Sequence, residues 1–573
     1  MDNNINALYK LWLENAVKDG DLIEELKSIE GKEDEILDRF YTSLEFGTAG
    51  LRGTIGAGTN RMNIYTVGQA TQGLADYLNG CFENPSVAIA YDSRIKSELF
   101  AKTAAGILAA NGVKTYIYDV LVPTPMLSYA VIELKCSSGI IITASHNPSK
   151  YNGYKCYDYR GYQMTDESAE KTLGYIREVD VFKDIKWMDF EKGLENGLIE
   201  YIPENIKQGF YDAILKCRIN PDVYEKSGIK VIYSPLNGTG NIPVRHILNT
   251  VGVKDLRVVK AQELPDGNFP TCPFPNPEIR QVFEEGLKMT DEFPADILLA
   301  TDPDCDRVGI AVRDNGEYKL MTGNEVACML TNYVLTSRIE NGTLPENPII
   351  VKTIVTSPLV RAICDRYGAQ MIDLLTGFKY IGEVVDELIN KGEGERFLLG
   401  MEESYGYLSG THAKDKDAVN ASMLIIEMAA YYKLRGKTLI QVMDDLYTEY
   451  GMYLSSLFNF GFEGADGMAK MKSMMEGLRE NPPQSFGGLD VLAVSDYRCG
   501  ERTASDGTKT KINLPSSNVL SYELYDDSKI IVRPSGTEPK IKIYITAHFK
   551  TRDEAAAATE KFIADAKKYM GIE

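Results

Sequence analysis

The chain repeats one pattern, in which an apolar, β-branched run stops abruptly and a polar turn follows it. The clearest case is Gly139-Ile-Ile-Ile-Thr-Ala-Ser145-His146-Asn147-Pro148. Such a run predicts a buried strand that ends in a tight turn. The turn would present Ser145 at the carboxyl end of the strand, where open α/β sheets commonly hold their ligands, which makes Ser145 a candidate nucleophile. Ser, Asn, Pro and Gly are also ordinary turn formers, so this stretch alone leaves a purely structural turn as an equal alternative.

Two further stretches repeat the arrangement of strand and polar turn. Asp302-Pro-Asp304-Cys-Asp306-Arg307 follows a predicted strand at 297–300, and Glu402-Glu403-Ser404-Tyr-Gly406 follows one at 396–401. Strand and helix patterns alternate through all three regions. This alternation predicts successive α/β layers.

Length and pattern together predict several domains. At roughly 150 residues per domain, the 573-residue chain is long enough for about four. After about residue 455, a helical pattern near 468–479, a strand at 541–545 and an Ala-rich helix from about 553 to 568 favour an α+β domain. The first forty residues predict a single amphipathic lead-in helix. We expect the domain boundaries 1–205, 206–318, 319–452 and 453–573.

The composition is that of an ordinary globular protein, with 44% hydrophobic and 25% charged residues. The formal net charge of -20 argues against binding to nucleic acid or to an anionic membrane, because both need a basic face. The start lacks the features of a signal peptide and no stretch approaches roughly 18 uninterrupted apolar residues, so we expect a cytoplasmic protein. Nine scattered cysteines without a C-x-x-C pair favour reduced thiols over disulfides or a zinc site.

Asp302, Asp304 and Asp306 alternate, so an extended backbone would project all three carboxylates to one side. Three such anions repel one another unless a cation lies between them. All-oxygen ligands in a short, rigid set favour Mg²⁺ over softer metals. An EF-hand does not fit, because Arg307 stands where its loop needs Gly and Arg313 where it needs Glu. A solvated acidic turn is the alternative, although apolar flanks on both sides favour a packed position.

A serine nucleophile raises the alternative of a Ser-His-Asp hydrolase. Neither Ser145 nor Ser535 lies in G-x-S-x-G, and His146 is too near Ser145 in sequence to be expected in triad geometry. The remaining histidines, expected to be structural or at the surface, are His246, His412 and His548. Phosphoryl transfer instead needs a divalent cation and basic groups around the phosphoryl oxygens. Because P-loop and kinase motifs are missing from the sequence, a phosphorylated Ser145 would fit as the donor.

Three other loops offer groups that suit an anion or a sugar. Arg52 lies in a Gly-rich stretch at 46–53, which is otherwise an ordinary turn pattern. Arg533-Pro-Ser535-Gly536-Thr537 combines a guanidinium, two hydroxyls and a Gly-loosened run of amides, the parts of an anion-binding nest, although a plain turn has the same composition. Glu402 and Ser404 suit sugar hydroxyls, with an exposed acidic loop as the alternative.

Together, four separated motifs resemble the α-D-phosphohexomutase family, and most closely its phosphoglucomutases. They occur in the family's order between about Phe46 and Tyr544: Thr143-Ala-Ser145-His146-Asn147-Pro148, Asp302-x-Asp304-x-Asp306-Arg307, Gly400-Met-Glu402-Glu403-Ser404-Tyr-Gly406 and Arg533-Pro-Ser535-Gly536-Thr537. The resemblance implies an α/β fold with four domains around a central cleft. Three of these domains would be similar α/β domains, and the fourth a smaller C-terminal α+β domain.

The resemblance also implies roles for individual residues. Ser145 would carry the phosphoryl group and, with Asp302, Asp304 and Asp306, would bind Mg²⁺. The residues around that phosphoryl group would be Arg52, His146 and Lys155. The residues that would bind the substrate are Arg307, Lys379, Glu402, Ser404, Arg533, Ser535, Gly536 and Thr537.

One departure bears on the substrate. Dual-specificity phosphomannomutase/phosphoglucomutases have Gly-Glu-Met-Ser-Gly-His at the sugar loop, whereas Gly406 stands here in place of the His. This resembles the glucose-handling branch, which implies interconversion of α-D-glucose 1-phosphate and glucose 6-phosphate, with glucose 1,6-bisphosphate as intermediate and activator. A phosphopentomutase, a phosphomannomutase and a glucose 1,6-bisphosphate synthase remain alternatives, as does an inactive sugar-phosphate sensor. We expect sugar phosphates as partners, neither nucleic acid nor membrane, and a monomer or homodimer.

Overall fold

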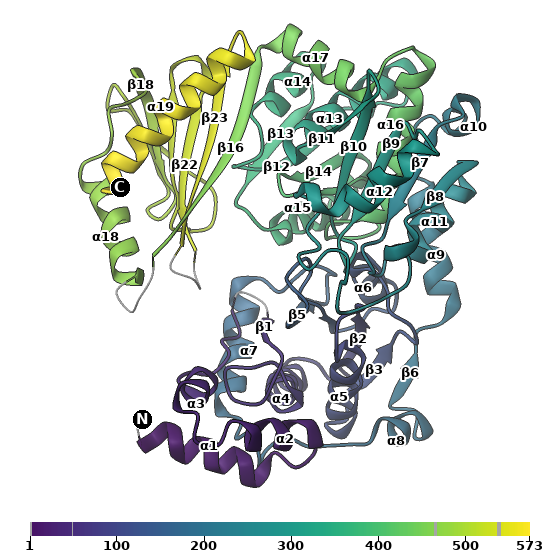
Figure 1. Ribbon diagram of the computed structural model, residues 1–573, viewed down its shortest axis with the longest axis vertical. Helices are drawn as coiled ribbons and strands as arrows, with labels where there is room; N and C mark the ends of the chain where they lie inside the picture. The colour runs from purple at the N-terminus through teal and green to yellow at the C-terminus, as the bar shows by residue number, and fades with distance from the viewer. Residues whose placement is uncertain (1–2, 48–49, 463–466, 536–539, 573) are drawn as a thin grey trace. The chain divides into compact units, whose positions relative to one another are not determined.

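The computed structural model describes residues 3–47, 50–462, 467–535 and 540–572. The chain folds into two compact units, and Figure 1 labels their helices and strands. The first comprises Met1–Met321, Ile381–Phe397 and Tyr405–Gly436, and the second comprises Thr322–Tyr380, Leu398–Ser404 and Lys437–Glu573. Both units contain parallel strands connected through helices, as the alternating strand and helix patterns predict.

Three short helices, α1 Asn3–Asn15, α2 Gly20–Ser28 and α3 Glu33–Phe40, begin the first unit. The prediction of a single lead-in helix was wrong because two local signals interrupt it. Asp19 caps α2 by accepting a hydrogen bond from the Asp21 N–H (3.1 Å). Gly31 has a φ of 78°, the left-handed conformation that commonly follows a helix end. Trp12 packs its buried ring against Phe40, which brings the short helices onto one core.

The first sheet has the strand order β1-β5-β4-β2-β3-β6. Its strands are β1 Gly50–Thr54, β2 Ser86–Tyr91, β3 Lys114–Ile117, β4 Ser138–Ile142, β5 Tyr151–Asp158 and β6 Ile199–Tyr201. The helices of this region are α4 Ile64–Cys81, α5 Ser97–Ala110, α6 Thr124–Glu133, α7 Asp166–Glu178, α8 Phe190–Glu195 and α9 Glu204–Leu215. Strands β4, β2, β3 and β6 run parallel, and β5 and β1 run antiparallel at one edge. Every residue of β4 is buried, as a central parallel strand requires, so polar chemistry can begin only beyond its carboxyl end.

The second sheet, also in the first unit, has the order β11-β10-β9-β7-β8. Its strands are β7 Lys230–Ser234, β8 Asp255–Val258, β9 Ile297–Thr301, β10 Val308–Asp314 and β11 Glu317–Met321. The helices around it are α10 Val223–Ser227, α11 Asn241–Thr250, α12 Glu284–Lys288 and α16 Ala418–Leu434. Strands β9, β7 and β8 are parallel, whereas β9, β10 and β11 form antiparallel pairs. The Asp-rich motif therefore connects two paired strands and is held at both of its ends.

The second unit holds two further sheets. One contains the order β13-β12-β14, and the other is antiparallel, with the order β16-β23-β22-β21-β18-β19-β20 and β17 paired to β18. The strands are β12 Ile349–Thr353, β13 Gln370–Leu374, β14 Phe397–Glu402, β16 Met452–Gly461, β17 Ser485–Phe486, β18 Leu489–Asp496, β19 Glu501–Ala504, β20 Lys509–Lys511, β21 Leu520–Leu524, β22 Lys529–Pro534 and β23 Lys540–Phe549. The helices are α13 Gly323–Glu340, α14 Leu359–Tyr367, α17 Leu439–Tyr450, α18 Gly467–Glu480 and α19 Arg552–Met570, and α15 Phe378–Asn390 begins in this unit. Within this unit, one apolar cluster joins Ile354 and Leu375, which follow β12 and β13, to Ile531 of β22 and Tyr544 of β23.

In the part of the chain that the structure describes, no helix combines the length and the apolar character needed to cross a membrane. The nine cysteines are all free thiols, and seven of them are buried. The thiols therefore agree with the expectation that disulfides do not stabilise this fold.

Candidate active site

Ser145 lies just beyond β4 and is buried, with 4% of its surface exposed. Its φ of 51° is in the left-handed region, which residues with a side chain rarely adopt. Thr143 supports this conformation because its hydroxyl oxygen accepts a hydrogen bond from the Ser145 N–H at 2.8 Å. The Ser145 hydroxyl donates to Asp302 Oδ2 at 2.7 Å. The Ser145 turn and the Asp-rich motif, which are far apart in the sequence, are therefore in direct contact.

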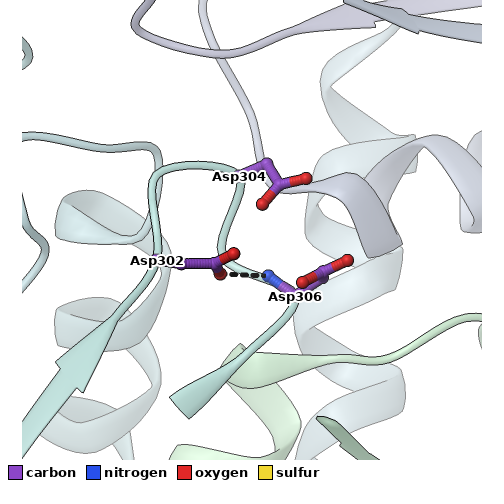
Figure 2. Close-up of side chains that lie close together, drawn as sticks. All are labelled: Asp302, Asp304 and Asp306. Carbon is purple, nitrogen blue, oxygen red and sulfur yellow. Dashed lines mark hydrogen bonds between the residues drawn. The ribbon is translucent and has the colours of Figure 1, made fainter. Parts of the chain in front are cut away.

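The Asp-rich loop between β9 and β10 is a tight turn. Cys305 has a φ of 51° and donates its N–H to the Asp302 carbonyl oxygen at 2.9 Å. The expectation of an extended backbone was therefore wrong, but the three carboxylates do converge, with one oxygen of each within 4.8 Å of the others (Figure 2). Asp302 Oδ1 also accepts the N–H groups of Asp306 at 3.2 Å and Arg307 at 3.0 Å, which fixes its direction.

The turn that precedes α11 holds the Asp loop from outside. A Cβ added to Gly238 would lie 2.4 Å from Pro303 Cα, so the approach requires glycine. Thr239 donates both its N–H (2.8 Å) and its hydroxyl (3.0 Å) to the Pro303 carbonyl oxygen. The turn at 237–240 thus has a specific structural role, which is to position the Asp loop.

Burial and neighbouring charges together set the pKa values of the three carboxyl groups. Burial raises the pKa of Asp302 well above the usual range, and the neighbouring Asp304 and Asp306 carboxylates raise it further. Burial, and then Asp304, also raise the pKa of Asp306. For Asp304, the Lys155 ammonium and two hydrogen bonds outweigh burial and lower the pKa. Close carboxylates in this environment destabilise one another unless a cation is present.

The donor set fits a hard divalent cation. Asp304 Oδ1 and Asp306 Oδ1 are buried and have no hydrogen-bond partner among the described residues. Buried polar atoms are ordinarily satisfied, so two such oxygens in one cluster indicate that a ligand belongs there. Carboxylate oxygens in a small, rigid set suit Mg²⁺, which favours the metal that the sequence predicted.

Lys155 and Thr124 contact the same carboxylate from different elements. Lys155, in β5, donates to Asp304 Oδ2 at 3.1 Å, and Thr124, at the start of α6, donates to the same oxygen at 3.2 Å. The Thr124 N–H also donates to the Asp304 carbonyl oxygen at 2.9 Å. An ammonium group and a hydroxyl therefore lie beside the carboxylates, next to Ser145.

Sequence reasoning missed Lys416 and the groups that hold it. Lys416 Nζ lies 3.2 Å from Asp306 Oδ2 and 2.9 Å from Asp415 Oδ1, and Tyr157 donates to the other oxygen of Asp415. The run of four charged residues just before α16, at 414–417, was the available signal. Such a run normally indicates a solvated surface, yet all four residues are buried.

His146 lies beside Ser145, with its Nδ1 3.2 Å from Ser145 Oγ. The left-handed backbone at Ser145 is what allows the contact. Burial lowers the pKa of His146 well below its usual range, and the cations Arg307 and Arg52 act in the same direction. A Ser-His-Asp arrangement does not result, because the Ser145 hydroxyl donates its hydrogen bond to Asp302.

The two predicted arginines of the first unit lie in the same surroundings. Arg52, in β1, is close enough to His146 to affect its pKa. Arg307 has its Nε 3.7 Å from Asp306 Oδ1 and its Nη1 3.2 Å from Glu278 Oε1. The structure therefore gathers every candidate of the first unit around Ser145 and the carboxylates.

The predicted sugar-binding residues lie in the second unit. Glu402, at the end of β14, is buried and its Oε1 accepts the Gly377 N–H at 2.9 Å. Gly377 has a φ of 120°, a conformation that residues with a side chain rarely adopt. Lys379 follows, with its Nζ 5.1 Å from the centre of the Tyr380 ring. Glu402 and the loop before α15 are thus brought together, and Ser404 lies half-buried near the end of the same segment.

The predicted phosphate loop follows β22 in the same unit. Arg533 is half-buried in that strand, and the Ser535 N–H donates to the Lys540 carbonyl oxygen at 2.7 Å. Gly536 and Thr537 lie outside the described residues. The described part of the loop therefore supplies one guanidinium and one hydroxyl of the predicted set.

Tyr544, in β23, connects the two loops of the second unit. Burial raises its pKa, the Glu403 carboxylate raises it further, and the Arg533 guanidinium opposes both effects. Glu403 also accepts a hydrogen bond from the Thr353 hydroxyl at 3.1 Å. The predicted sugar loop and Arg533 therefore share the surroundings of one tyrosine, which sequence reasoning did not single out.

Four family models of phosphoglucomutase/phosphomannomutase domains match the chain, one after another along the sequence. The alpha/beta/alpha domains I, II and III match residues 43–180, 208–316 and 322–450, and the C-terminal domain matches residues 509–566. The phosphoglucomutase of Staphylococcus aureus (strain MSSA476) is 36% identical over 555 residues, 96% of this chain and 97% of that protein. The phosphoglucomutase of Staphylococcus saprophyticus is 34% identical over 557 residues, 97% of this chain and 98% of that protein.

Solved structures show the same fold. A putative phosphomannomutase from Thermus thermophilus superposes with a TM-score of 0.68 at 22% identity, over 92% of this chain and 99% of that one. Fold and relatives together define a four-domain enzyme of the phosphotransferring isomerase class, with three α/β domains and a C-terminal domain. The chain belongs to the phosphoglucomutase/phosphomannomutase family.

Proposed function

We propose that the protein interconverts α-D-glucose 1-phosphate and glucose 6-phosphate through a phosphoserine at Ser145. The observation that carries this proposal is the 2.7 Å contact between the Ser145 hydroxyl and Asp302, beside two buried carboxylate oxygens that have no hydrogen-bond partner among the described residues. A serine held next to a divalent-cation site has the parts that phosphoryl transfer needs. The phosphoglucomutases of two staphylococci, similar over nearly the whole chain, support the choice of substrate.

The reaction would consist of two phosphoryl transfers. In the first, the bond between phosphorus and Ser145 Oγ breaks, a bond to the O6 of glucose 1-phosphate forms, and the O6 proton passes to Ser145 Oγ. In the second, the bond between phosphorus and O1 of glucose 1,6-bisphosphate breaks, a bond to Ser145 Oγ forms, and the Oγ proton passes to O1. The product is glucose 6-phosphate, and the enzyme is phosphorylated again.

The residues of the first unit would serve the transferred group. Asp302, Asp304 and Asp306 would hold Mg²⁺, and the bound ion would neutralise charge on the phosphoryl oxygens. Arg52, His146 and Lys155 would surround the same group, with Lys155 offsetting its charge. Lys155 already lies 3.1 Å from Asp304, which supports its place in this set.

The residues of the second unit would bind the rest of the substrate. Glu402 would accept hydrogen bonds from the sugar hydroxyls, Ser404 would donate or accept them, and Lys379 would face the substrate beside them. Arg533 and Ser535, with Gly536 and Thr537, would bind the phosphate that is not being transferred. The form Glu402-Glu403-Ser404-Tyr-Gly406 supports glucose over mannose.

The test couples product formation to glucose 6-phosphate dehydrogenase, with purified protein, Mg²⁺, glucose 1,6-bisphosphate and glucose 1-phosphate. Wild type should turn over, and Ser145→Ala should not. Intact mass should show one phosphate on wild type and none on the variant. Normal turnover by Ser145→Ala would overturn the phosphoserine mechanism. Much faster turnover of ribose 1-phosphate or mannose 1-phosphate would overturn the glucose assignment, and binding without turnover would indicate a sensor.

We further propose a cytoplasmic monomer or homodimer that needs only sugar phosphates and Mg²⁺. Light scattering on the eluted protein gives the oligomeric state, and cell fractionation gives the location. A larger assembly, or protein in a membrane or secreted fraction, would contradict this part of the proposal.

A further inference from the structure

Arg94 lies at the carboxyl end of β2, beside the Ser145 loop, and its guanidinium contacts that loop through four backbone carbonyl groups. Its Nη1 donates to the carbonyl oxygens of Pro148 and Tyr151, both at 3.0 Å. Its Nη2 donates to the carbonyl oxygens of Ser145 and Asn147. The Arg94 side chain is completely buried, so each of these hydrogen bonds forms away from water.

The surroundings of Arg94 fix its orientation. Asp92 Oδ2 lies 3.4 Å from Arg94 Nε, and Asp92 Oδ1 accepts the Arg94 N–H at 2.9 Å and the Ser97 hydroxyl at 2.7 Å. The Phe269 ring lies over the guanidinium, with its centre 5.1 Å away. Asp92 and Phe269 therefore fix the direction and the plane of the guanidinium independently of its contacts with the Ser145 loop.

The terminal N–H groups of Arg94 are all engaged by backbone carbonyl oxygens, which argues against a direct role in phosphate binding. A guanidinium has five N–H groups. Four of those on Arg94 serve carbonyl oxygens, and the fifth, on Nε, forms no hydrogen bond among the described residues although it lies 3.4 Å from Asp92 Oδ2. The four carbonyl oxygens that accept from Arg94 are thereby held in fixed directions. The left-handed backbone of Ser145 needs such external support, because that conformation is unfavourable for a residue with a side chain.

We propose that Arg94 is a positioning residue for phosphoryl transfer, holding the Ser145 loop in the conformation that accepts and releases the phosphoryl group. This inference rests on the proposed function. Transfer from glucose 1,6-bisphosphate to Ser145 breaks a P–O bond to the sugar, forms the P–Oγ bond and moves the Oγ proton to the sugar oxygen. A loop displaced by a fraction of an ångström slows this step, while substrate contacts elsewhere are kept.

The experiment measures Ser145 phosphorylation in a single turnover, with Mg²⁺ and glucose 1,6-bisphosphate as the donor, by intact mass. Arg94→Lys keeps the charge but cannot reach four carbonyl oxygens in one plane. We expect its phosphorylation rate and kcat to fall on the order of tenfold to a hundredfold, with KM for glucose 1-phosphate within about twofold of wild type. The matched control is Arg160→Lys. Arg160 pairs with Asp158 at the end of β5 and should keep wild-type rates.

Asp92→Asn is the second variant, because it keeps the shape of the residue that orients Arg94 while removing its charge. It should show a smaller loss with the same pattern, a lower kcat and an unchanged KM. Wild-type phosphorylation rates in Arg94→Lys, or an equal loss in Arg160→Lys, would overturn the positioning role. If Arg94→Lys does not fold, wild-type kinetics in Asp92→Asn would overturn it instead. Failure of wild type to become phosphorylated on Ser145 would refute the proposed function itself, which is a distinguishable result.

Discussion

The left-handed backbone of Ser145 leads to a quantitative prediction. Ser145→Ala and Ser145→Gly both remove the hydroxyl that donates to Asp302 at 2.7 Å, and both should abolish phosphorylation. They differ in backbone freedom, because only glycine adopts a φ of 51° without strain. We therefore expect Ser145→Gly to be the more stable of two inactive variants.

The structure sets the size of each contribution. Loss of a hydrogen bond to a buried carboxylate should destabilise either variant by about 1.5–3 kcal/mol. Relief of the left-handed strain should return about 1–2 kcal/mol in Ser145→Gly. The greater freedom of glycine in the unfolded chain offsets about 0.4–1 kcal/mol of that gain. The glycine variant should accordingly exceed the alanine variant in free energy of unfolding by about 1 kcal/mol.

The assay is native-state hydrogen exchange at the backbone amides of β4, in the presence of a metal chelator. Local exchange is preferable to one melting curve, since a chain with two units can unfold in more than one step. The matched control is Asn315, an exposed turn residue between β10 and β11 with a φ of 49°. Asn315→Gly should also exceed Asn315→Ala by about 1 kcal/mol. Equal stability of the two Ser145 variants, with the expected difference at Asn315, would refute the left-handed conformation of Ser145.

Three further predictions concern metal, sugar and phosphate. Asp304→Asn should raise the Mg²⁺ concentration needed for half-maximal rate on the order of tenfold or more, because an anionic carboxylate ligand becomes a neutral amide. Wild-type activity that survives exhaustive chelation would contradict the metal site. Glu402→Gln should weaken substrate binding by about 1.5–3 kcal/mol, measured as kcat/KM on glucose 1-phosphate; wild-type efficiency would remove Glu402 from the sugar site. Arg533→Ala should bind both sugar phosphates more weakly and release more free glucose 1,6-bisphosphate per product in a single turnover, with Arg533→Lys between it and wild type. If Arg533→Ala keeps the wild-type affinity for both sugar phosphates and the wild-type ratio of released bisphosphate to product, the loop does not bind phosphate.

The sequence predicted the parts of the fold and site that depend on local pattern. The runs before Ser145, Asp302 and Glu402 form β4, β9 and β14, because short apolar runs bounded by turn residues predict buried strands. The divalent-cation hypothesis also followed from local spacing, and the carboxylates do converge. The extended backbone assumed for the Asp motif was wrong, since Cys305 turns the chain through the left-handed region.

Contacts between distant segments could not be predicted in this way, because they leave no local pattern in the sequence. Arg94 follows a strand and looked like any strand-end residue, yet its four acceptors lie 51 to 57 positions further along the chain. Lys416 lay in a charged run that resembled a surface segment, and only the fold places it beside Asp306. For His146 the sequence argued only against a triad role, and it carried no signal for the 3.2 Å contact of Nδ1 with Ser145 Oγ.

The contact between Gly238 and Pro303 limits how this protein can change over generations. A methyl group at residue 238 would meet the backbone of Pro303, with its Cα at 2.4 Å and its carbonyl oxygen at 2.6 Å, and backbone atoms cannot rotate aside as a flexible side chain can. Any replacement must therefore shift the loop that bears the three carboxylates and break the hydrogen bonds from Thr239 that hold it. The codon for Gly238 can drift silently, but its amino acid cannot drift unless a compensating change in the Asp loop arises with it.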